Sequence, residues 1–239
     1  MGTPALIGLS RQMLMKRQLS VIANNIANVS TVGFKSENLL FAEHLAKAGK
    51  SEPVSFVRST GSVRDRSMGK LIDTTNPLDL AIQGNGYFAV ETPFGTRYTR
   101  NGHFQMNELH QIITSDGHPL LSDNERPITL RPGEQEITIS RSGQVSSASG
   151  KIGKIQLHRF ADENALIRME NGLYRSELPP EEAKTSEVLQ GKLEQSNVEP
   201  ISEITKMISL ARAYESASKL IQGENDRKRR AIQALTRMN

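Results

Sequence analysis

Apolar residues recur at helical spacing near the N-terminus of the 239-residue chain. The row consists of Met15, Leu19, Ile22, Ile26 and Val29, with successive members four, three, four and three residues apart. This spacing is typical of a helix that packs along another helix. Thr3-Pro4 can supply an N-cap and a first-turn proline, and Gly33 interrupts the pattern. The sequence therefore predicts a helix from Thr3 to about Val29.

The C-terminal forty residues show a similar pattern that begins near Pro200. One row consists of Met207, Leu210, Tyr214, Ala217 and Ile221. A second row beside it consists of Ile201, Ile204, Ile208 and Ala211. Two rows form an apolar stripe that is wider than one partner helix would cover.

The two terminal helices are predicted to pack against each other, because isolated apolar-striped helices are only marginally stable in water. The residues expected to form this contact are Leu19, Ile22, Ile26, Val29, Met207, Leu210, Tyr214 and Ile221. The second C-terminal row, and an offset N-terminal row of Leu6, Leu9 and Met13, would remain exposed. Exposed apolar helices are typical of a subunit that assembles with others.

Between the helices the pattern changes to alternation with turn residues, as in "GYFAVE", "RYTRNGHFQ" and "QIITSDGHPLL", which predicts antiparallel strands. The expected fold is α+β, with paired N- and C-terminal coiled-coil-like helices flanking a central antiparallel β domain. The expected domains are a helical core of residues 1–34 and 197–239, an extended linker of 35–75, a β domain of 76–176, and a return linker of 177–196.

Composition narrows the function classes. The chain has no cysteine, which excludes disulfides, thiolate metal sites and cysteine nucleophiles. No apolar run approaches the roughly 20 residues that span a bilayer, so a membrane-spanning protein is not expected. Arg11, Lys16 and Arg17 interrupt any signal-peptide apolar region, and export with a cleavable signal peptide is therefore not expected either.

No catalytic, cofactor or metal site is expected, and the chain is predicted not to be an enzyme. Gly84 to Ala89 matches a dinucleotide-binding fingerprint, but a strand-like run with Pro93 follows where that motif needs a helix. The glycines are better explained as a turn before a strand. The five histidines have no metal-binding spacing.

A basic cluster, Asp226 to Arg230, suggests the alternative of a basic coiled-coil protein that binds nucleic acid. Asp226 and Glu224 dilute its charge, and the net charge of the chain is only +4. A solvated charged face, or ion pairs between subunits, is therefore the favoured interpretation.

Three separated motifs resemble the bacterial flagellar rod and hook proteins. They are "VIANNIANVSTVGFK", the central "NPLDLAIQGNGYFAVETPFGTRYTRNGHF", and the C-terminal "SNVEPISEITKMISLARAYESASKLIQ". The opening "ALIGLSRQMLMKRQLSVIANN" and the length are most similar to subunits of the proximal rod; a distal-rod or hook subunit is the alternative.

The resemblance implies helical assembly with copies of itself and with other rod subunits, with the terminal helices inside and the β domain outside. It also implies export through the flagellar type III apparatus to the periplasmic rod of the basal body. Nucleic acid is not expected as a partner.

Three asparagines, Asn24, Asn25 and Asn28, interrupt the apolar N-terminal segment although asparagine is a poor helix former. Amide side chains both donate and accept hydrogen bonds and can fix the register between helices. The hypothesis is that these three form an amide face that meets a neighbouring subunit. The alternative is a solvated polar face near the helix end.

Overall fold

The computed structural model describes residues 3–46, 54–133 and 136–236, which form two compact units. The helical unit contains the chain up to Ala27, residues Glu37–Arg64, and the chain from Glu199 onward. The β unit contains Asn28–Ser36 and Asp65–Val198. The predicted α+β fold, with two long terminal helices in contact and small antiparallel sheets between them in the sequence, is confirmed.

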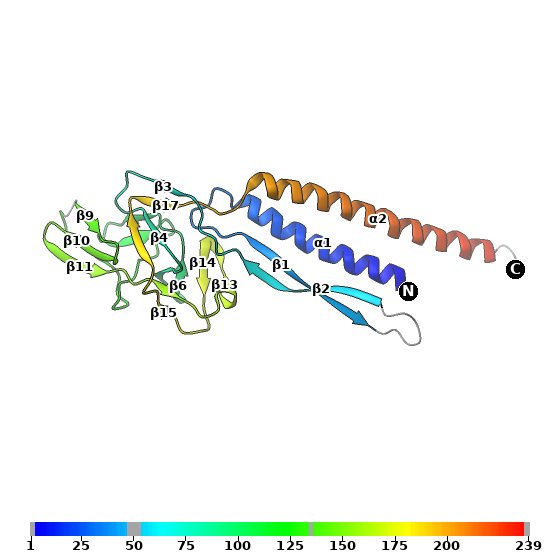
Figure 1. Cartoon of the computed structure of the whole chain (residues 1–239), viewed down its shortest axis with the longest axis horizontal. Coiled ribbons are helices and arrows are strands. Elements are labelled where there is room, and N and C mark those ends of the chain that lie inside the picture. The colour runs from blue at the N-terminus through cyan, green and yellow to red at the C-terminus, as the bar shows by residue number, and fades with distance from the viewer. Residues whose placement is uncertain (1–2, 47–53, 134–135, 237–239) are drawn as a thin grey trace. The chain divides into compact units, whose positions relative to one another are not determined.

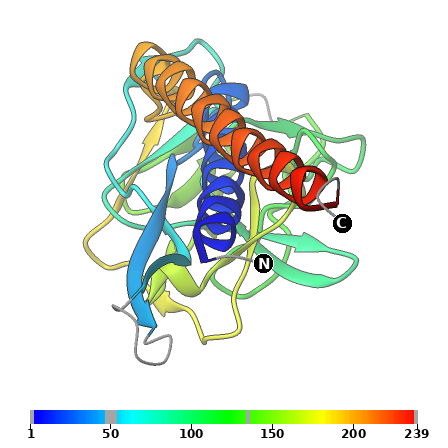
Figure 2. The same ribbon diagram turned by 90° about the vertical axis from the view of Figure 1, so that its right-hand side faces the viewer.

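The helical unit consists of two long helices and one hairpin. Helix α1 spans Thr3–Ala27 and α2 spans Pro200–Thr236. Strands β1 (Glu37–Ala46) and β2 (Val54–Arg64) pair in antiparallel fashion. Helix α1 lies between α2 and this hairpin and contacts both, as Figures 1 and 2 show.

Helix α1 is followed by a turn that only glycine fits. Gly33 has a φ of +69°, in the left-handed region that disfavours side chains. A Cβ atom at this position would lie 2.5 Å from the backbone carbonyl carbon and oxygen of Arg100. The Gly33 N–H also donates to the Glu194 carbonyl at 2.7 Å. The "TVGF" turn is thus built around a close backbone approach within the β unit.

The β unit is a set of small antiparallel sheets around one main core. The largest sheet has the order β13-β14-β6-β5, and a three-stranded sheet has the order β11-β10-β9. The strands are β3 (Leu71–Asp73), β4 (Leu80–Gln83), β5 (Phe88–Thr92), β6 (Gly95–Thr99), β7 (Phe104–Met106), β8 (Ile112–Thr114), β9 (Ile137–Ile139), β10 (Gln144–Ser147), β11 (Gly150–Lys154), β12 (His158–Arg159), β13 (Ile167–Arg168), β14 (Leu173–Arg175), β15 (Glu181–Glu182), β16 (Glu187–Gln190) and β17 (Lys192–Glu194). Two short 3-10 helices, η1 (Glu163–Ala165) and η2 (Glu170–Gly172), lie between strands.

Alternating side chains of these strands fill the core. Phe88 and Phe104 are fully buried, and their rings meet edge to face with centroids 5.3 Å apart, an arrangement that aromatic rings prefer. A second cluster contains Tyr87, Tyr98 and Tyr174. On β5, Phe88 and Val90 belong to the main core and Ala89 to the second cluster, so this strand is buried on both faces.

Two segments predicted as linkers contain paired strands. Residues 37–46 and 54–64, within the predicted linker 35–75, form the paired strands β1 and β2. Residues 181–194, within the predicted return linker 177–196, form β15, β16 and β17, which pair with β12, β4 and β3. The physical reason is that Val188 and Leu193 alternate with polar residues and are buried. Residues 1–2, 47–53, 134–135 and 237–239 of the predicted domains lie outside the described residues.

The fingerprint-like Gly84 to Ala89 forms a turn and the beginning of a strand. Gly84 has a φ of +101°, and β5 begins at Phe88. A strand therefore stands where a dinucleotide-binding motif would need a helix.

Candidate assembly interface

The seam between α1 and α2 is apolar and mostly covered. On α1, Met15 and Ile22 are buried, and Leu19 and Ile26 are half-buried. On α2, the half-buried residues are Met207, Leu210, Tyr214 and Ile221. Val29 lies beyond the end of α1, in the turn of residues 28–30, and is half-buried in the β unit. The predicted pairing residues on the two helices thus have the burial of a packed helix face; the individual pairings remain a prediction.

The two helices approach closely at Gly8. A Cβ atom at Gly8 would lie 2.9 Å from Cγ1 and 3.0 Å from Cδ1 of Ile221. Small residues permit this kind of close approach between helix backbones, whereas a larger side chain here would push Ile221 aside.

A second apolar row remains uncovered on α2. It consists of Ile201, Ile204 and Ile208, which we call the outer row, and these side chains are 82%, 46% and 48% exposed. On α1, Leu9 and Met13 are also exposed. Leu6, predicted to belong with them, lies where the structure describes no side chains. The helical unit therefore has apolar surface beyond what its two helices cover in each other.

One of the three asparagines is used inside the chain. Asn25 is 1% exposed, accepts a hydrogen bond from the Glu37 N–H at 3.0 Å, and donates to the Glu37 carbonyl at 3.0 Å. It also donates to Oε2 of the buried Glu203 on α2 at 3.1 Å. The other oxygen of Glu203 accepts from Lys206 at 2.6 Å. This amide joins α1, α2 and the start of β1, which explains its presence in an apolar helix.

The other two asparagines lie nearer the surface. Asn24 is exposed, and Asn28 is half-buried just after the last residue of α1. The Thr31 hydroxyl donates to Oδ1 of Asn28 at 3.2 Å. The three asparagines therefore differ: Asn25 is buried within its own chain, whereas Asn24 is exposed and Asn28 is half-buried. Contact of Asn24 and Asn28 with a neighbouring subunit stays a prediction.

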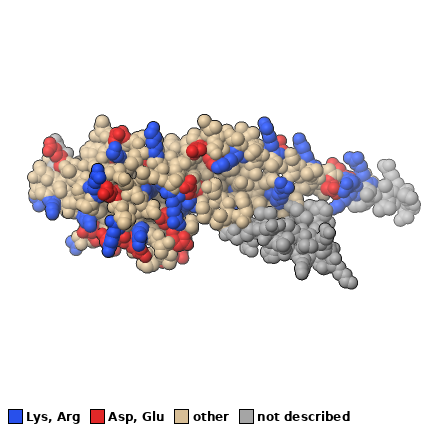
Figure 3. Space-filling view, viewed as in Figure 1, with Lys and Arg blue, Asp and Glu red and all other residues tan. Residues whose placement is uncertain are grey.

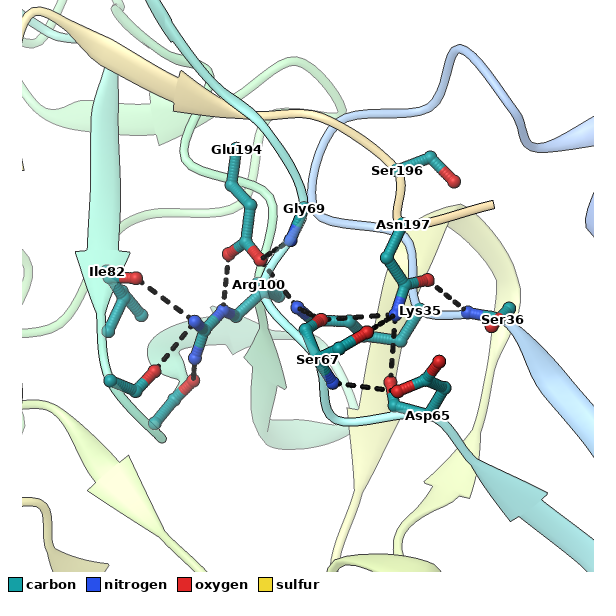
Figure 4. A network of polar contacts seen from close by, with 12 residues as sticks. Lys35, Ser36, Asp65, Ser67, Gly69, Ile82, Arg100, Glu194, Ser196 and Asn197 are labelled. Atoms are coloured by element: carbon teal, nitrogen blue, oxygen red, sulfur yellow. Dashed lines mark hydrogen bonds and ion pairs between the residues drawn. The ribbon is translucent and has the colours of Figure 1, made fainter. Parts of the chain in front are cut away.

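A buried ionic cluster, which we call the Glu194 cluster, ties distant segments of the β unit together (Figure 4). Glu194 accepts hydrogen bonds from Lys35 Nζ at 2.5 Å, Arg100 Nε at 2.7 Å and the Gly69 N–H at 3.0 Å. Arg100 also donates to the carbonyls of Gly86, Ile82 and Gly84. Every charge is therefore paired or hydrogen-bonded, as buried charges require.

The electrostatics of the cluster favour the ionised carboxylate. Burial by itself would raise the pKa of Glu194, but the Arg100 guanidinium and the Lys35 ammonium outweigh burial and hold that pKa below its usual value. Burial lowers the pKa of Lys35, and its ion pair with Glu194 opposes that effect. The Glu194 carboxylate forms ion pairs with both cations of the cluster, Lys35 and Arg100.

The neighbouring Asn197 completes the connection. Its Oδ1 accepts from the Ser36 N–H at 2.7 Å, and its Nδ2 donates to the carbonyls of Asp65 and Ser67 at 3.1 Å. Lys35 also donates to the Ser67 carbonyl at 2.7 Å. Hydrogen bonds thus link three segments of the β unit that are distant in sequence, around residues 33–36, 65–69 and 194–198.

Surface charge is interspersed on the face shown in Figure 3, where Lys and Arg lie among Asp and Glu. The basic cluster of α2 is not purely cationic, because Arg227 pairs with Glu224 at 2.6 Å. A continuous basic face, which nucleic-acid binding would require, is not visible on this side.

Comparisons with known proteins match the chain to flagellar proteins. Family models match residues 6–35 (flagella basal body rod protein), 81–147 (flagellar hook protein FlgE/F/G D1 domain) and 189–234 (flagellar basal body rod FlgEFG protein C-terminal). The flagellar basal-body rod protein FlgF of Caulobacter vibrioides is 39% identical, with 98% of each chain covered. That of Mesorhizobium japonicum is 34% identical with 96% of each covered, and the rod protein FlgG of Bacillus subtilis is 34% identical, covering 90% of this chain and 92% of FlgG.

The chain belongs to the flagellar basal-body rod protein family.

As a rod protein it is a structural subunit, not an enzyme, and the family implies assembly with other rod subunits. Among the residues that the structure describes, no group of three His, Asp or Glu side chains could hold a metal ion. No helix in the described ranges is long and apolar enough to cross a membrane.

Sequence reasoning missed the Glu194 cluster of this rod protein. Lys35 and Glu194 are 159 residues apart, and Arg100 and Glu194 are 94 apart. Both ends of the cluster fell in segments predicted as linkers. A usable signal was the strand-like alternation of Lys192, Leu193 and Glu194, which places Glu194 on a paired strand.

Proposed function

We propose that this chain is a subunit of the proximal rod, which assembles helically through its terminal helices into part of the drive shaft for flagellum-dependent motility. The FlgF proteins of three bacteria support this position in the rod, because they match 96–98% of the chain. FlgG proteins match 85–90% of it. A distal-rod or hook position is the alternative within the family.

The observation that carries the assembly mechanism is the outer row. Three isoleucines lie on one face of α2, exposed although the adjacent row is covered by α1. Fully burying an isoleucine contributes roughly 1.5–3 kcal/mol, so covering these partly exposed side chains contributes roughly 3–5 kcal/mol in total. Association itself costs roughly 4–15 kcal/mol. Two copies should therefore bind weakly, and a copy in a helical array that touches several neighbours should bind well.

The amide face gives the second part of this proposal. Asn24 and Asn28 lie one turn apart and offer donors and acceptors that can set register against a neighbour. Replacing Asn24 with alanine raises the helix propensity of α1, and replacing Asn28 removes the acceptor of the Thr31 hydroxyl in the turn after it. Assembly that weakens in this double variant supports the amide face, and unchanged assembly supports the solvated-face alternative.

The remaining parts of the proposal concern the arrangement of the subunit in the rod and the pathway by which it is exported. We infer that the terminal helices form the inner tube, that the β unit lies outside, and that the chain reaches the periplasmic rod through the flagellar type III export apparatus. Two features support this route. The chain contains no cysteine, so its folding after export needs no oxidation, and its helices have apolar faces that gain stability from partners.

The test is a charge placed in the outer row. The double variant Ile204→Asp/Ile208→Asp should abolish concentration-dependent polymers in sedimentation and fail to restore motility to cells that lack the protein, because carboxylates would be buried unpaired. Ser209→Asp is the matched control, since it adds a carboxylate to an exposed position on the same helix outside the row.

The folded state of the β unit is monitored in each variant by the near-UV signal of its three buried tyrosines. Polymers and motility that survive the double variant, with the β unit folded, would refute the outer row as the assembly surface.

A further inference from the structure

A groove of about 560 Å³ lies in the β unit beside the turn that joins β5 to β6. We call it the hairpin-tip groove. Its apolar lining includes Phe94, which is 81% exposed, and the exposed Ile167 and Met169. Single exposed apolar residues are ordinary on protein surfaces, but three around one groove indicate a contact site.

The rim of the hairpin-tip groove is cationic. Arg97, Arg168 and Arg175 line it, with Glu170 as an opposing charge. Arg97 donates to the Thr96 carbonyl at 2.8 Å, while its buried Nε has no hydrogen-bond acceptor in the part of the chain that the structure describes. A guanidinium of this kind gains most from a carboxylate, which can accept two parallel hydrogen bonds. The groove is therefore suited to an apolar residue flanked by carboxylates.

The chain itself carries such a segment. Residues 177–182 read Glu-Leu-Pro-Pro-Glu-Glu, with three carboxylates and no cation. Leu178 is an exposed apolar residue within it. Two prolines restrict the unfolded freedom of the segment, which reduces the ordering cost on binding.

The carboxylates of this segment already have weak partners. Arg175 pairs with Glu177 at 3.2 Å, Arg159 with Glu181 at 2.8 Å, and Lys154 with Glu182 at 3.8 Å, all with exposed side chains. Exposed ion pairs contribute at most about 1 kcal/mol. Exchanging these exposed ion pairs for contacts with a less exposed arginine should therefore cost little free energy.

We propose that residues 177–182 of one copy bind in the hairpin-tip groove of the next copy. Leu178 enters between Phe94 and Ile167, and the flanking glutamates bind the arginine rim. The groove and the segment consist of different residues, although Arg175 of the groove pairs with Glu177 of its own chain. The contact between copies is therefore heterologous and continues from copy to copy instead of closing as a dimer. This inference rests on the proposed function, because the helical units must first bring copies together.

The test uses disulfide trapping, which is specific because the chain has no cysteine. Phe94→Cys and Leu178→Cys single variants of the full chain are mixed at polymerising concentration and oxidised. The 94–178 disulfide should form at least about fivefold more than the control disulfide between Phe94→Cys and Leu109→Cys, a ratio that ~1 kcal/mol of preference produces. Leu109 is a matched control because it is a 70% exposed leucine of the same β unit.

A second arm tests the charge. Arg97→Glu in the Phe94→Cys chain should lower the yield of the 94–178 disulfide several-fold, and Arg97→Lys should lower it less. Equal yields of the 94–178 and 94–109 disulfides within intact polymers would overturn the docking contact and leave the proposed function standing. Absence of polymers in the unmodified chain would overturn the proposed function, and the docking contact with it.

Discussion

Replacing Glu194 with glutamine should be among the most destabilising single changes in the β unit. The side chain is 1% exposed and receives two cationic donors, Lys35 and Arg100, and one backbone N–H, from Gly69. Glutamine has nearly the same shape, so the change removes charge without creating a cavity. It leaves an ammonium and a guanidinium buried, each with a side-chain exposure of 7%.

The expected loss in the free energy of unfolding is about 3–5 kcal/mol, the range observed when one partner of a buried ion pair is removed. Glutamine keeps one uncharged acceptor oxygen and replaces the other with an NH2 group that cannot accept from a cation. Hydrogen bonds to charged groups contribute roughly 1.5–3 kcal/mol each, so weakening one and losing the other agrees with that range. A typical domain has only about 5–15 kcal/mol of net stability. The β unit of the variant should therefore be partly unfolded or close to it.

The assay is urea unfolding of the full chain, followed by near-UV circular dichroism. The chain has four tyrosines and no tryptophan, and Tyr87, Tyr98 and Tyr174 are buried in the β unit, so this signal mainly reports that unit. Glu181→Gln is the matched control, because its ion pair with Arg159 is about half exposed and should contribute at most about 1 kcal/mol. Equal losses in the two variants would refute the reasoning that burial makes the Glu194 cluster strong.

Three further predictions concern the titration of Glu194, the turn at Gly33 and the buried amide of Asn25. The pKa of Glu194 is held below its ordinary value of 4.5. The unmodified chain should therefore have a higher free energy of unfolding than Glu194→Gln above pH 4.5, and this difference should disappear as pH falls through the lower folded-state pKa. Urea unfolding at a series of pH values measures the difference. Gly33→Ala should cost about 2 kcal/mol or more in the same assay, because the left-handed φ and the Arg100 backbone exclude a side chain; no loss would contradict the turn geometry. Asn25→Ala should cost about 1–3 kcal/mol despite its higher helix propensity, because it strips a hydrogen bond from the buried Glu203. Helix melting by far-UV circular dichroism tests this, and a raised melting temperature would show that the amide is not structural.

The sequence by itself was sufficient for the helices. The rows around Ile22 and Leu210 repeat every three to four residues, and this period arises from hydrogen bonds within the helix itself. The sequence was also sufficient to predict strands in the middle of the chain, because successive side chains of an extended backbone point to opposite faces. It also predicted the turn at Gly84, where a strand and not a helix follows. Family membership was likewise readable, since the three motifs are contiguous stretches of chain.

Only the tertiary structure decided where the polar residues act. Asn25 contacts Glu203 across 178 positions, and Lys35 contacts Glu194 across 159. A polar residue at a helical or strand position can face solvent, a neighbour or a buried partner, and its local pattern is the same in each case. The strands within the predicted return linker 177–196 show this: β15, β16 and β17 pair with β12, β4 and β3, which lie far away in the sequence. Local periodicity sets the elements, whereas pairing of buried charges and strand edges depends on which remote residues the folded chain brings within a few ångströms.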